Sequence, residues 1–354
     1  MNVKIHSTEL NRMMKTITQC IDPKSPKLGN IEVIYDNNLF TIRSTNGHMS
    51  AVVSTPLLGG NGEVFCVDGT MFARVCAMCN GEVGIETNGK VCSIKGAGRT
   101  RLPIVDADIP AFDTVTGKEC KIRAELFTAG YNSVSYAISA DQNRPVLTGV
   151  YMESTGDAVN MVTLDGFKMA VESVPCEADG FTIVVPGFFM KLVSASVFAG
   201  ETVKFRTDGK RIQASTDGMM IACTLLANDF PDYKKIVPQE FRTSTILHAD
   251  AIQYALKSGS VVNTANNLVK LVIGDTNITV MSNSEQADFD ADISCMTNGE
   301  WLKIAFNHKY LMETIASITG NEIVMRFNSS VSPCIISEKT TAGYRLILPV
   351  RVAG

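Results

Sequence analysis

Apolar residues recur at helical spacing in six segments of the chain, and each segment begins with a plausible helix start signal. In the first segment, Leu10, Met14 and Ile17 fall on one stripe, which predicts an amphipathic helix from near Ser7. Ser7 or Thr8 is expected to cap that helix. The other five predicted helices begin near Asp68, Arg123, Pro186, His248 and Asn307.

Between the predicted helices, apolar and polar residues alternate in short runs that are separated by Asn-Gly or Asp-Gly. This pattern indicates antiparallel hairpins, because those dipeptides favour two-residue turns. The segments 46–52 (NGHMSAV) and 165–171 (DGFKMAV) are nearly the same sequence, 119 positions apart. The chain therefore consists of half-repeats of roughly 60 residues, each with one helix and several antiparallel strands.

A proline close to aromatic residues also recurs, at Pro110, Pro231 and Pro349, with intervals of 121 and 118 residues. Each proline is expected to end the last strand of a repeat, because proline lacks the N–H that a ladder needs. Two half-repeats then form one α+β domain, and the chain has three similar domains. The predicted domains are 1–117, 118–241 and 242–354.

The six helices are more basic than the rest of the chain. Their windows contain seven Lys or Arg and four Asp or Glu, whereas the whole chain of 354 residues has a net charge of −4. One interpretation is a positive surface that faces phosphates; the other is a set of ordinary solvated helix faces. The basic residues are Arg12, Lys15, Arg74, Arg123, Lys191, Lys257 and Lys309.

No motif in the sequence points to catalysis, to a metal or to a cofactor. None of the four histidines lies in a metal-ligand or nucleophile motif, and Cys76-Ala-Met-Cys79 lies on the apolar face of a predicted helix. The glycine-rich stretch KGAGRTR (95–101) joins two predicted strands, so it does not fit a phosphate loop. The N-terminus lacks the apolar core of a secretory signal, and no apolar run is long enough for a membrane span. These features predict a non-catalytic cytoplasmic protein.

Four segments together resemble the bacterial DNA polymerase III beta subunit, the sliding clamp. They are RPVLTGVYMES (144–154), TLDGFKMAVESVP (163–175), NDFPDYKKIVP (228–238) and YRLILPVRV (344–352). The resemblance covers the whole chain in order and implies a DNA-clamp fold. It also implies a homodimer in which two subunits join head to tail as a ring around duplex DNA. Such a processivity factor serves DNA replication without being an enzyme.

The resemblance further implies a groove between the second and third domains that binds short peptides of partner proteins. In this family the turn is usually Thr-Asp-Gly-His-Arg-Leu, whereas here Phe167, Lys168 and Met169 follow Gly166. The matching positions predict an apolar groove with a cationic rim. They are Leu147, Leu164, Gly166, Phe167, Lys168, Met169, Pro231, Lys235, Ile236, Leu346, Leu348, Pro349 and Val350.

The remaining expectations concern DNA, self-association and partners. The resemblance adds Lys24 and Lys27 to the basic residues that would contact DNA, and it places Leu102, Val261 and Val262 at the subunit interface. The implied partners are double-stranded DNA, a second copy, the polymerase III alpha subunit, the clamp loader and other proteins with clamp-binding peptides, with no membrane partner. The alternative is a clamp-fold interaction scaffold of a mobile element that does not encircle DNA.

Overall fold

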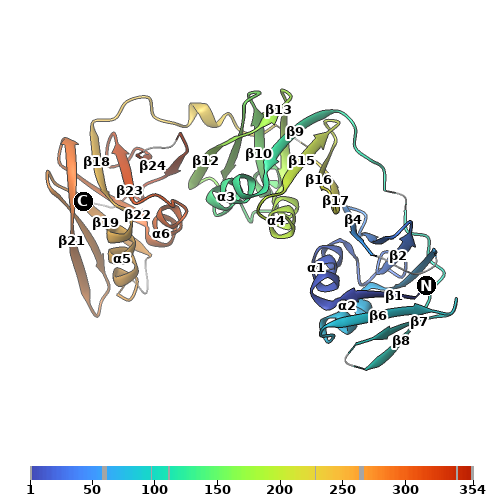
Figure 1. Ribbon diagram of the computed structural model, residues 1–354. Coiled ribbons are helices and arrows are strands. Elements are labelled where there is room, and N and C mark those ends of the chain that lie inside the picture. Colours follow the sequence, from blue (N-terminus) through green and yellow to red (C-terminus); the bar gives the residue numbers. More distant parts are fainter. Residues whose placement is uncertain are drawn as a thin grey trace. The chain divides into compact units, whose positions relative to one another are not determined.

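A computed structural model describes most of the chain (Figure 1). The chain divides into two compact units. The described residues are 2–57, 62–96, 98–110, 112–227, 229–262, 267–339 and 342–351, so Ala97, Asn228 and Val352 of the motifs quoted above lie outside them. Unit 1 comprises Met1–Phe127, Cys176–Asp179 and Phe188–Leu225, and unit 2 comprises Thr128–Pro175, Gly180–Gly187 and Leu226–Gly354.

The helix prediction from apolar periodicity is confirmed. Within the described residues there are six α-helices, one in each predicted segment. They are α1 (Ser7–Ile17), α2 (Gly69–Ala77), α3 (Ala124–Ser135), α4 (Gly187–Ser196), α5 (Ala249–Gly259) and α6 (His308–Ala316), and the short 3-10 helices are η1 (Thr18–Cys20), η2 (Pro145–Thr148) and η3 (Tyr233–Lys235).

The cap of α1 differs from the prediction. His6 is the N-cap residue, and its ring nitrogen Nδ1 accepts a hydrogen bond from the backbone N–H of Thr8. Ser7 already lies in the helix, and its own N–H bonds to the carbonyl of Gly81. A strand that runs directly into a helix therefore moves the cap one residue earlier than a Ser or Thr signal suggests.

Unit 1 contains two antiparallel sheets. The four-stranded sheet has the order β1-β6-β7-β8, and the nine-stranded sheet has the order β13-β9-β15-β16-β17-β4-β3-β2-β5. Their strands are β1 (Asn2–His6), β2 (Asn30–Asp36), β3 (Leu39–Thr45), β4 (Met49–Pro56), β5 (Glu63–Asp68), β6 (Glu82–Thr87), β7 (Val91–Lys95), β8 (Arg99–Pro103), β9 (Lys118–Arg123), β13 (Glu177–Ala178), β15 (Thr202–Thr207), β16 (Arg211–Thr216) and β17 (Met219–Thr224).

Unit 2 contains one sheet of twelve strands, in the order β14-β10-β11-β12-β25-β24-β23-β18-β21-β20-β19-β22. One of its apolar cores packs α5 and α6 against strands β18 to β24 through Ile252, Leu256, Leu311 and Ile315. The strands are β10 (Gly149–Ser154), β11 (Ala158–Leu164), β12 (Lys168–Pro175), β14 (Thr182–Pro186), β18 (Thr243–His248), β19 (Leu268–Ile273), β20 (Asn277–Asn283), β21 (Asp288–Gly299), β22 (Leu302–Asn307), β23 (Glu322–Phe327), β24 (Cys334–Glu338) and β25 (Tyr344–Ile347).

The recurring prolines do not end the strands, so this part of the prediction is wrong. Strands β8, β17 and β25 stop at Pro103, Thr224 and Ile347, before Pro110, Pro231 and Pro349 are reached. The prolines lie instead in the connections that follow.

The division into three domains remains a prediction. The boundary between the two compact units runs through α3 and α4. The predicted domain boundaries lie elsewhere, between β8 and β9 and between η3 and β18. No helix in the described part of the chain is long and apolar enough to cross a membrane.

Candidate functional site

The candidate groove is built on the ladder between β12 and β25 in unit 2. Met169 lies opposite Leu346, and Lys168 lies opposite Ile347. The N–H of Leu348 donates to the carbonyl of Phe167 over 2.9 Å, so hydrogen bonding continues beyond the last ladder pair. This register brings the turn at 165–167 and the C-terminal segment, which are far apart in the sequence, to the same edge of the site.

Beneath this edge is a buried apolar cluster. Four of the predicted groove residues belong to it, together with Tyr233 from η3. Tyr233 is the tyrosine of the FPDYKKI motif. Its ring lies beside that of Tyr151, with 5.9 Å between the two ring centroids, and this contact anchors η3. Its hydroxyl donates to Glu153 at 3.2 Å, and burial raises the pKa of this phenol. The four predicted residues are Leu147, Leu164, Met169 and Leu346.

The exposed part of the site is a rim of large apolar side chains. Phe167 is 55% exposed and Leu348 is 37% exposed, and Ile236 and Val350 are exposed to a similar degree as Leu348. Met169, in contrast, is only 2% exposed. Substituting Met169 would therefore disturb the core of unit 2, whereas Leu348 can be changed at the surface.

The turn before β12 follows the chemistry that its sequence predicts. Asp165 accepts hydrogen bonds from the N–H groups of Phe167 and Lys168 at 2.8 and 2.9 Å, and Gly166 has a φ of +97°. A left-handed residue is needed there, and glycine adopts that conformation without a Cβ clash. The turn holds Phe167 outward, with its ring 5.7 Å from that of Tyr310.

The cationic rim is smaller than predicted, because Lys168 is buried. Its side chain is 6% exposed and pairs with Glu313 of α6, and its Nζ lies 5.2 and 5.0 Å from the ring centroids of Tyr136 and Tyr310. A lysine that pairs inside the fold cannot offer its charge to a peptide. Lys235 is 84% exposed and pairs with Asp232 at 3.0 Å, so it carries the positive charge of the predicted set at the surface.

A second buried ion pair beside the groove was not predicted. Arg345 Nη2 donates to Glu172 Oε2 at 2.8 Å, its Nη1 donates to the carbonyl of Val171 at 2.8 Å, and its Nε donates to Ser317 Oγ at 3.1 Å. These bonds join β25, β12 and the end of α6. The signal in the sequence was the charged Arg345 within the apolar run YRLILP. A charge that is buried in a strand without a partner costs free energy, so a partner was to be expected.

The predicted DNA-contacting residues are mostly exposed. In unit 1, Arg12 is the exception, since it is half-buried and its Nε donates to Glu9 at 2.9 Å. Arg123 is exposed but pairs with Glu125 at 3.1 Å, and Lys309 in unit 2 lies 3.9 Å from Glu313. The other six are exposed and make no ion pair with a described residue: Lys15, Lys24, Lys27, Arg74, Lys191 and Lys257.

The three predicted interface residues fall into two groups. Leu102 is buried inside unit 1 on β8, opposite Cys92. In unit 2, Val261 is 78% exposed and Val262 is half-buried, directly after α5. Only the valines are therefore available as side chains for another molecule.

The thiols of the C-x-x-C pair are buried, and burial raises the pKa of Cys76. Among the described residues, no group of His, Cys, Asp and Glu is arranged to hold a metal ion.

Comparison with known proteins agrees with this geometry. Sequence-family models of the DNA polymerase III beta subunit match residues 121–232 (central domain) and 234–351 (C-terminal domain). The beta sliding clamp of Streptomyces coelicolor is 24% identical over 353 residues and covers 94% of both chains, and that of Lactococcus lactis is 24% identical and covers 98% of both. The crystal structure of the Thermotoga maritima beta subunit matches with a TM-score of 0.91 at 23% identity, over 99% of this chain and 100% of that one. The chain belongs to the DNA polymerase III beta subunit family, and the α+β clamp fold predicted from its sequence is confirmed.

Proposed function

We propose that this protein is a cytoplasmic processivity clamp that encircles duplex DNA as a homodimer and tethers a replicative polymerase. It is not an enzyme in this role. The observation that carries the proposal is the combination of the clamp fold over the whole described chain with an exposed apolar rim at the end of the β12–β25 ladder. The scaffold that does not encircle DNA is not favoured, because the chain aligns over nearly its full length with proteins named beta sliding clamps.

The rim fits a short peptide with aliphatic or aromatic anchors. Phe167, Leu348, Ile236 and Val350 present apolar surface above a rigid buried floor, and a few such contacts carry most of the affinity in interfaces of this kind. Because an extended peptide must be ordered on binding, we expect a dissociation constant on the order of micromolar. The partners are the polymerase III alpha subunit, the clamp loader and other proteins with such a peptide.

DNA would be held without sequence readout. The exposed cations on α1, α2, α4 and α5 suit contacts with phosphates, which give salt-sensitive, sequence-independent affinity. The decisive experiment is clamp loading onto nicked circular DNA, followed by cutting of the circle. A clamp stays on the circle and is released on linearisation, whereas retention on the linear DNA, or no loading at all, would contradict encirclement.

The groove is tested separately with Leu348→Asp. Its backbone bond to Phe167 is kept, while a charge replaces an exposed anchor. Calorimetry with a synthetic glutamine-leucine-aromatic peptide should show binding weakened at least tenfold, with DNA loading unchanged. Val331→Asp, at an exposed valine in a turn of the same unit, is the matched control. Equal peptide binding by parent and Leu348→Asp would mean that the groove is misplaced.

A further inference from the structure

The cysteines of this chain differ in their access to solvent. All ten lie in the described residues, and eight of them are buried. The other two, Cys176 and Cys295, are half-buried. An oxidant from solvent reacts with a thiol that it can reach, so these two are the candidates for redox chemistry.

Strand pairing places Cys176 beside a second cysteine in unit 1. Strand β13 has two residues and lies at the edge of the nine-stranded sheet, with Ala178 opposite Cys120 and Glu177 opposite Lys121. Side chains alternate between the two faces of a sheet, so Cys176 lies on the same face as Ala178 and Cys120. Glu177 and Lys121 lie on the other face, where their charged atoms are 3.7 Å apart.

The two thiols are hydrogen-bond neighbours. Cys120 is fully buried, and its burial, followed by the charge and the hydrogen bond of Cys176, raises its pKa. Cys120 therefore keeps its proton inside the fold. Cys176 is the more exposed sulfur of the two, so it meets an oxidant first, and Cys120 lies behind it as a resolving thiol.

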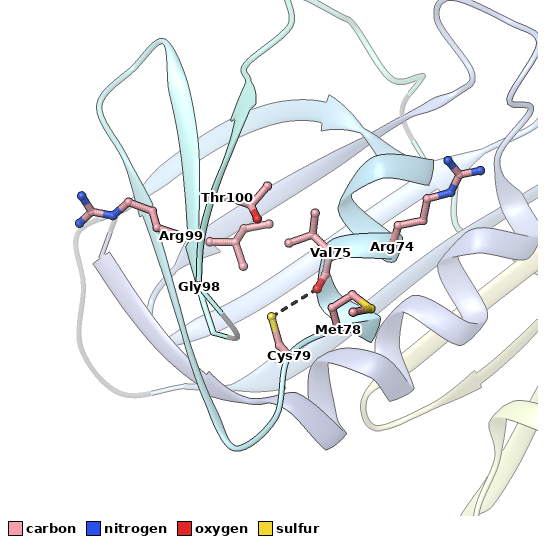
Figure 2. Close-up of a pocket in the computed structure, with 8 residues that line it drawn as sticks. Arg74, Val75, Met78, Cys79, Gly98, Arg99 and Thr100 are labelled. Atoms are coloured by element: carbon pink, nitrogen blue, oxygen red, sulfur yellow. Dashed lines mark hydrogen bonds between the residues drawn. The ribbon is translucent and has the colours of Figure 1, made fainter.

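The other cysteines lack this combination of access and a neighbouring thiol. The Cys79 thiol, in the wall of a cavity that Val75 also lines, donates to the carbonyl of Val75 at 3.3 Å (Figure 2). The half-buried Cys295 has its sulfur 3.4 Å from the hydroxyl of Thr297. A carbonyl or a hydroxyl cannot form a disulfide. The remaining neighbouring thiols are all buried; they are Cys20 with Cys223, and Cys76 with Cys79 and Cys92.

We propose that Cys176 and Cys120 form a reversible disulfide when the protein meets a peroxide, and that this bond staples β13 to β9. The Cys176 sulfur attacks one peroxide oxygen, the O–O bond breaks, and a sulfenic acid and water are formed. The Cys120 sulfur then attacks the Cys176 sulfur, and the S–O bond breaks. The oxygen leaves as water with the proton of Cys120. Two thiols are thereby oxidised by two electrons, and one hydrogen peroxide is reduced to two waters.

The position of the pair suits such a bond. A disulfide requires Cα atoms within roughly 7 Å, close to the spacing of diagonal neighbours in an antiparallel ladder. At the far end of β13, the N–H of Asp179 donates to the carbonyl of Glu119, and the N–H of Glu119 donates to Asp179 Oδ2, both at 2.8 Å. The disulfide would secure the near end, where Cys176 follows Pro175.

The staple would act on a segment that is short and at an edge. Cys176–Asp179 belongs to unit 1, whereas the stretches before and after it in the chain belong to unit 2. Such a segment can detach locally at a lower free energy than the core of a sheet. A covalent bond between β13 and β9 opposes that detachment and also constrains the unfolded chain. This chemistry would be the same whether or not the protein encircles DNA.

The test compares the full-length parent with Cys176→Ser, Cys120→Ala and the matched control Cys295→Ser. Each folded protein is treated with dilute hydrogen peroxide, its remaining thiols are alkylated with iodoacetamide in denaturant, and its protease fragments are weighed by mass spectrometry. The parent and Cys295→Ser should yield a linked fragment that contains Cys120 and Cys176, lacks two hydrogens and separates on addition of dithiothreitol. Cys176→Ser and Cys120→Ala should not yield it.

Hydrogen exchange measures the staple itself. The amide of Asp179 should exchange more slowly in the oxidised parent, on the order of tenfold, and at the unoxidised rate in peroxide-treated Cys176→Ser. Because Cys176 is half-buried, its serine variant should fold even if Cys120→Ala does not, and far-UV circular dichroism checks both.

Three results would overturn the proposal. The first is recovery of alkylated Cys120 together with Cys176 as a sulfinic acid, which would mean that Cys120 does not resolve the sulfenic acid. The second is a disulfide between two chains, seen as a dimer band on a non-reducing gel. The third is a linked fragment without slower exchange at Asp179, which would show that the bond does not staple β13.

Discussion

Two ladders join successive repeats within the chain, β4–β17 in unit 1 and β12–β25 in unit 2, and we call them the first and second junctions. They have the same backbone pairing, because Ser50 and Met169, the first paired residues after equivalent turns, lie opposite Ala222 and Leu346, but their side chains differ in chemistry. In β4–β17, Ala51 lies opposite Ile221, and both are fully buried. In β12–β25, the equivalent pair is Ala170 and Arg345, and the arginine bonds to Glu172 and to Ser317 of the α6 region. The comparison shows that the backbone pairing recurs from one repeat to the next, while the side chains differ between the junctions.

The second junction is also the one with an exposed apolar rim. Lys168 and Arg345 use their charges inside the fold, so the surface above them is dominated by Phe167 and Leu348. Buried ion pairs add little net stability but penalise alternative arrangements that would leave a charge unpaired. We therefore infer that the ion pairs of Lys168 and Arg345 fix the packing of β12, β25 and α6 beneath the apolar rim.

The largest expected effect on stability comes from breaking the ion pair between Arg345 and Glu172. Arg345→Met leaves Glu172 without its partner beside the apolar cluster, which should lower the free energy of unfolding by about 3–5 kcal/mol. Ile221→Val at the equivalent position of the first junction should cost about 0.5–1.5 kcal/mol. Urea unfolding of the two variants measures the contrast, and equal losses would show that the two junctions are held in the same way.

An intermediate effect on stability is expected at Arg12 but not at Lys15, although both are cations on α1. Arg12 pairs with Glu9 and lies over the ring of Phe198 at 5.4 Å, whereas Lys15 is exposed without an ion partner among the described residues. Arg12→Ala should lower stability by about 1 kcal/mol, because the packing on Phe198 and the pairing with Glu9 are both removed. Replacing Lys15, Arg74 and Lys191 with Ala should leave stability nearly unchanged.

The same variants should differ in their DNA binding. The triple change should reduce the salt slope of DNA affinity by roughly 0.9 for each phosphate that is no longer neutralised, up to about 2.7 for each subunit of the ring. Fluorescence anisotropy with duplex DNA at several salt concentrations measures this slope. An unchanged slope would place the DNA face on other elements.

The smallest expected effect is a pH dependence of stability that comes from His308 in unit 2. His308, the first residue of α6, is buried with Nε2 2.7 Å from the carbonyl of Leu256, and burial lowers its pKa. The unfolded chain then binds the proton more readily, so stability is present above about pH 6.5 and is lost as the pH falls from there toward the folded pKa.

Helices α2, α4 and α6 each begin the second half-repeat of a predicted domain. The first residues of α2 and α4 are Gly69 and Gly187, so these two helices have no imidazole at the position that His308 occupies in α6. His308→Gln should flatten the decrease in thermal stability between pH 7 and pH 5. The exposed His48→Gln is the control and should retain the parent profile. A parent profile that is already flat would contradict the burial argument.

Local patterns in the chain were enough to locate the elements and the repeat. Helices such as α1 and α5 follow from apolar spacing, and hairpins such as β11–β12 follow from Asp-Gly between alternating runs, because both signals act over a few neighbouring residues. The apolar groove set followed from the family motifs, and four of its members lie in one buried cluster. Periodicity alone could not have assembled them, since they come from segments that are distant in the chain.

Solvent exposure of these residues, in contrast, was set by the tertiary fold. Met169 and Leu348 have the same apolar character in sequence, but the ladder buries the first against Leu346 and leaves the second exposed just beyond the last pair. Lys168 was expected at the surface, and Glu313, which lies far along the chain, neutralises it instead. Burial and ion pairing depend on contacts between distant segments, and a local pattern contains no information about which distant charge will be brought within reach.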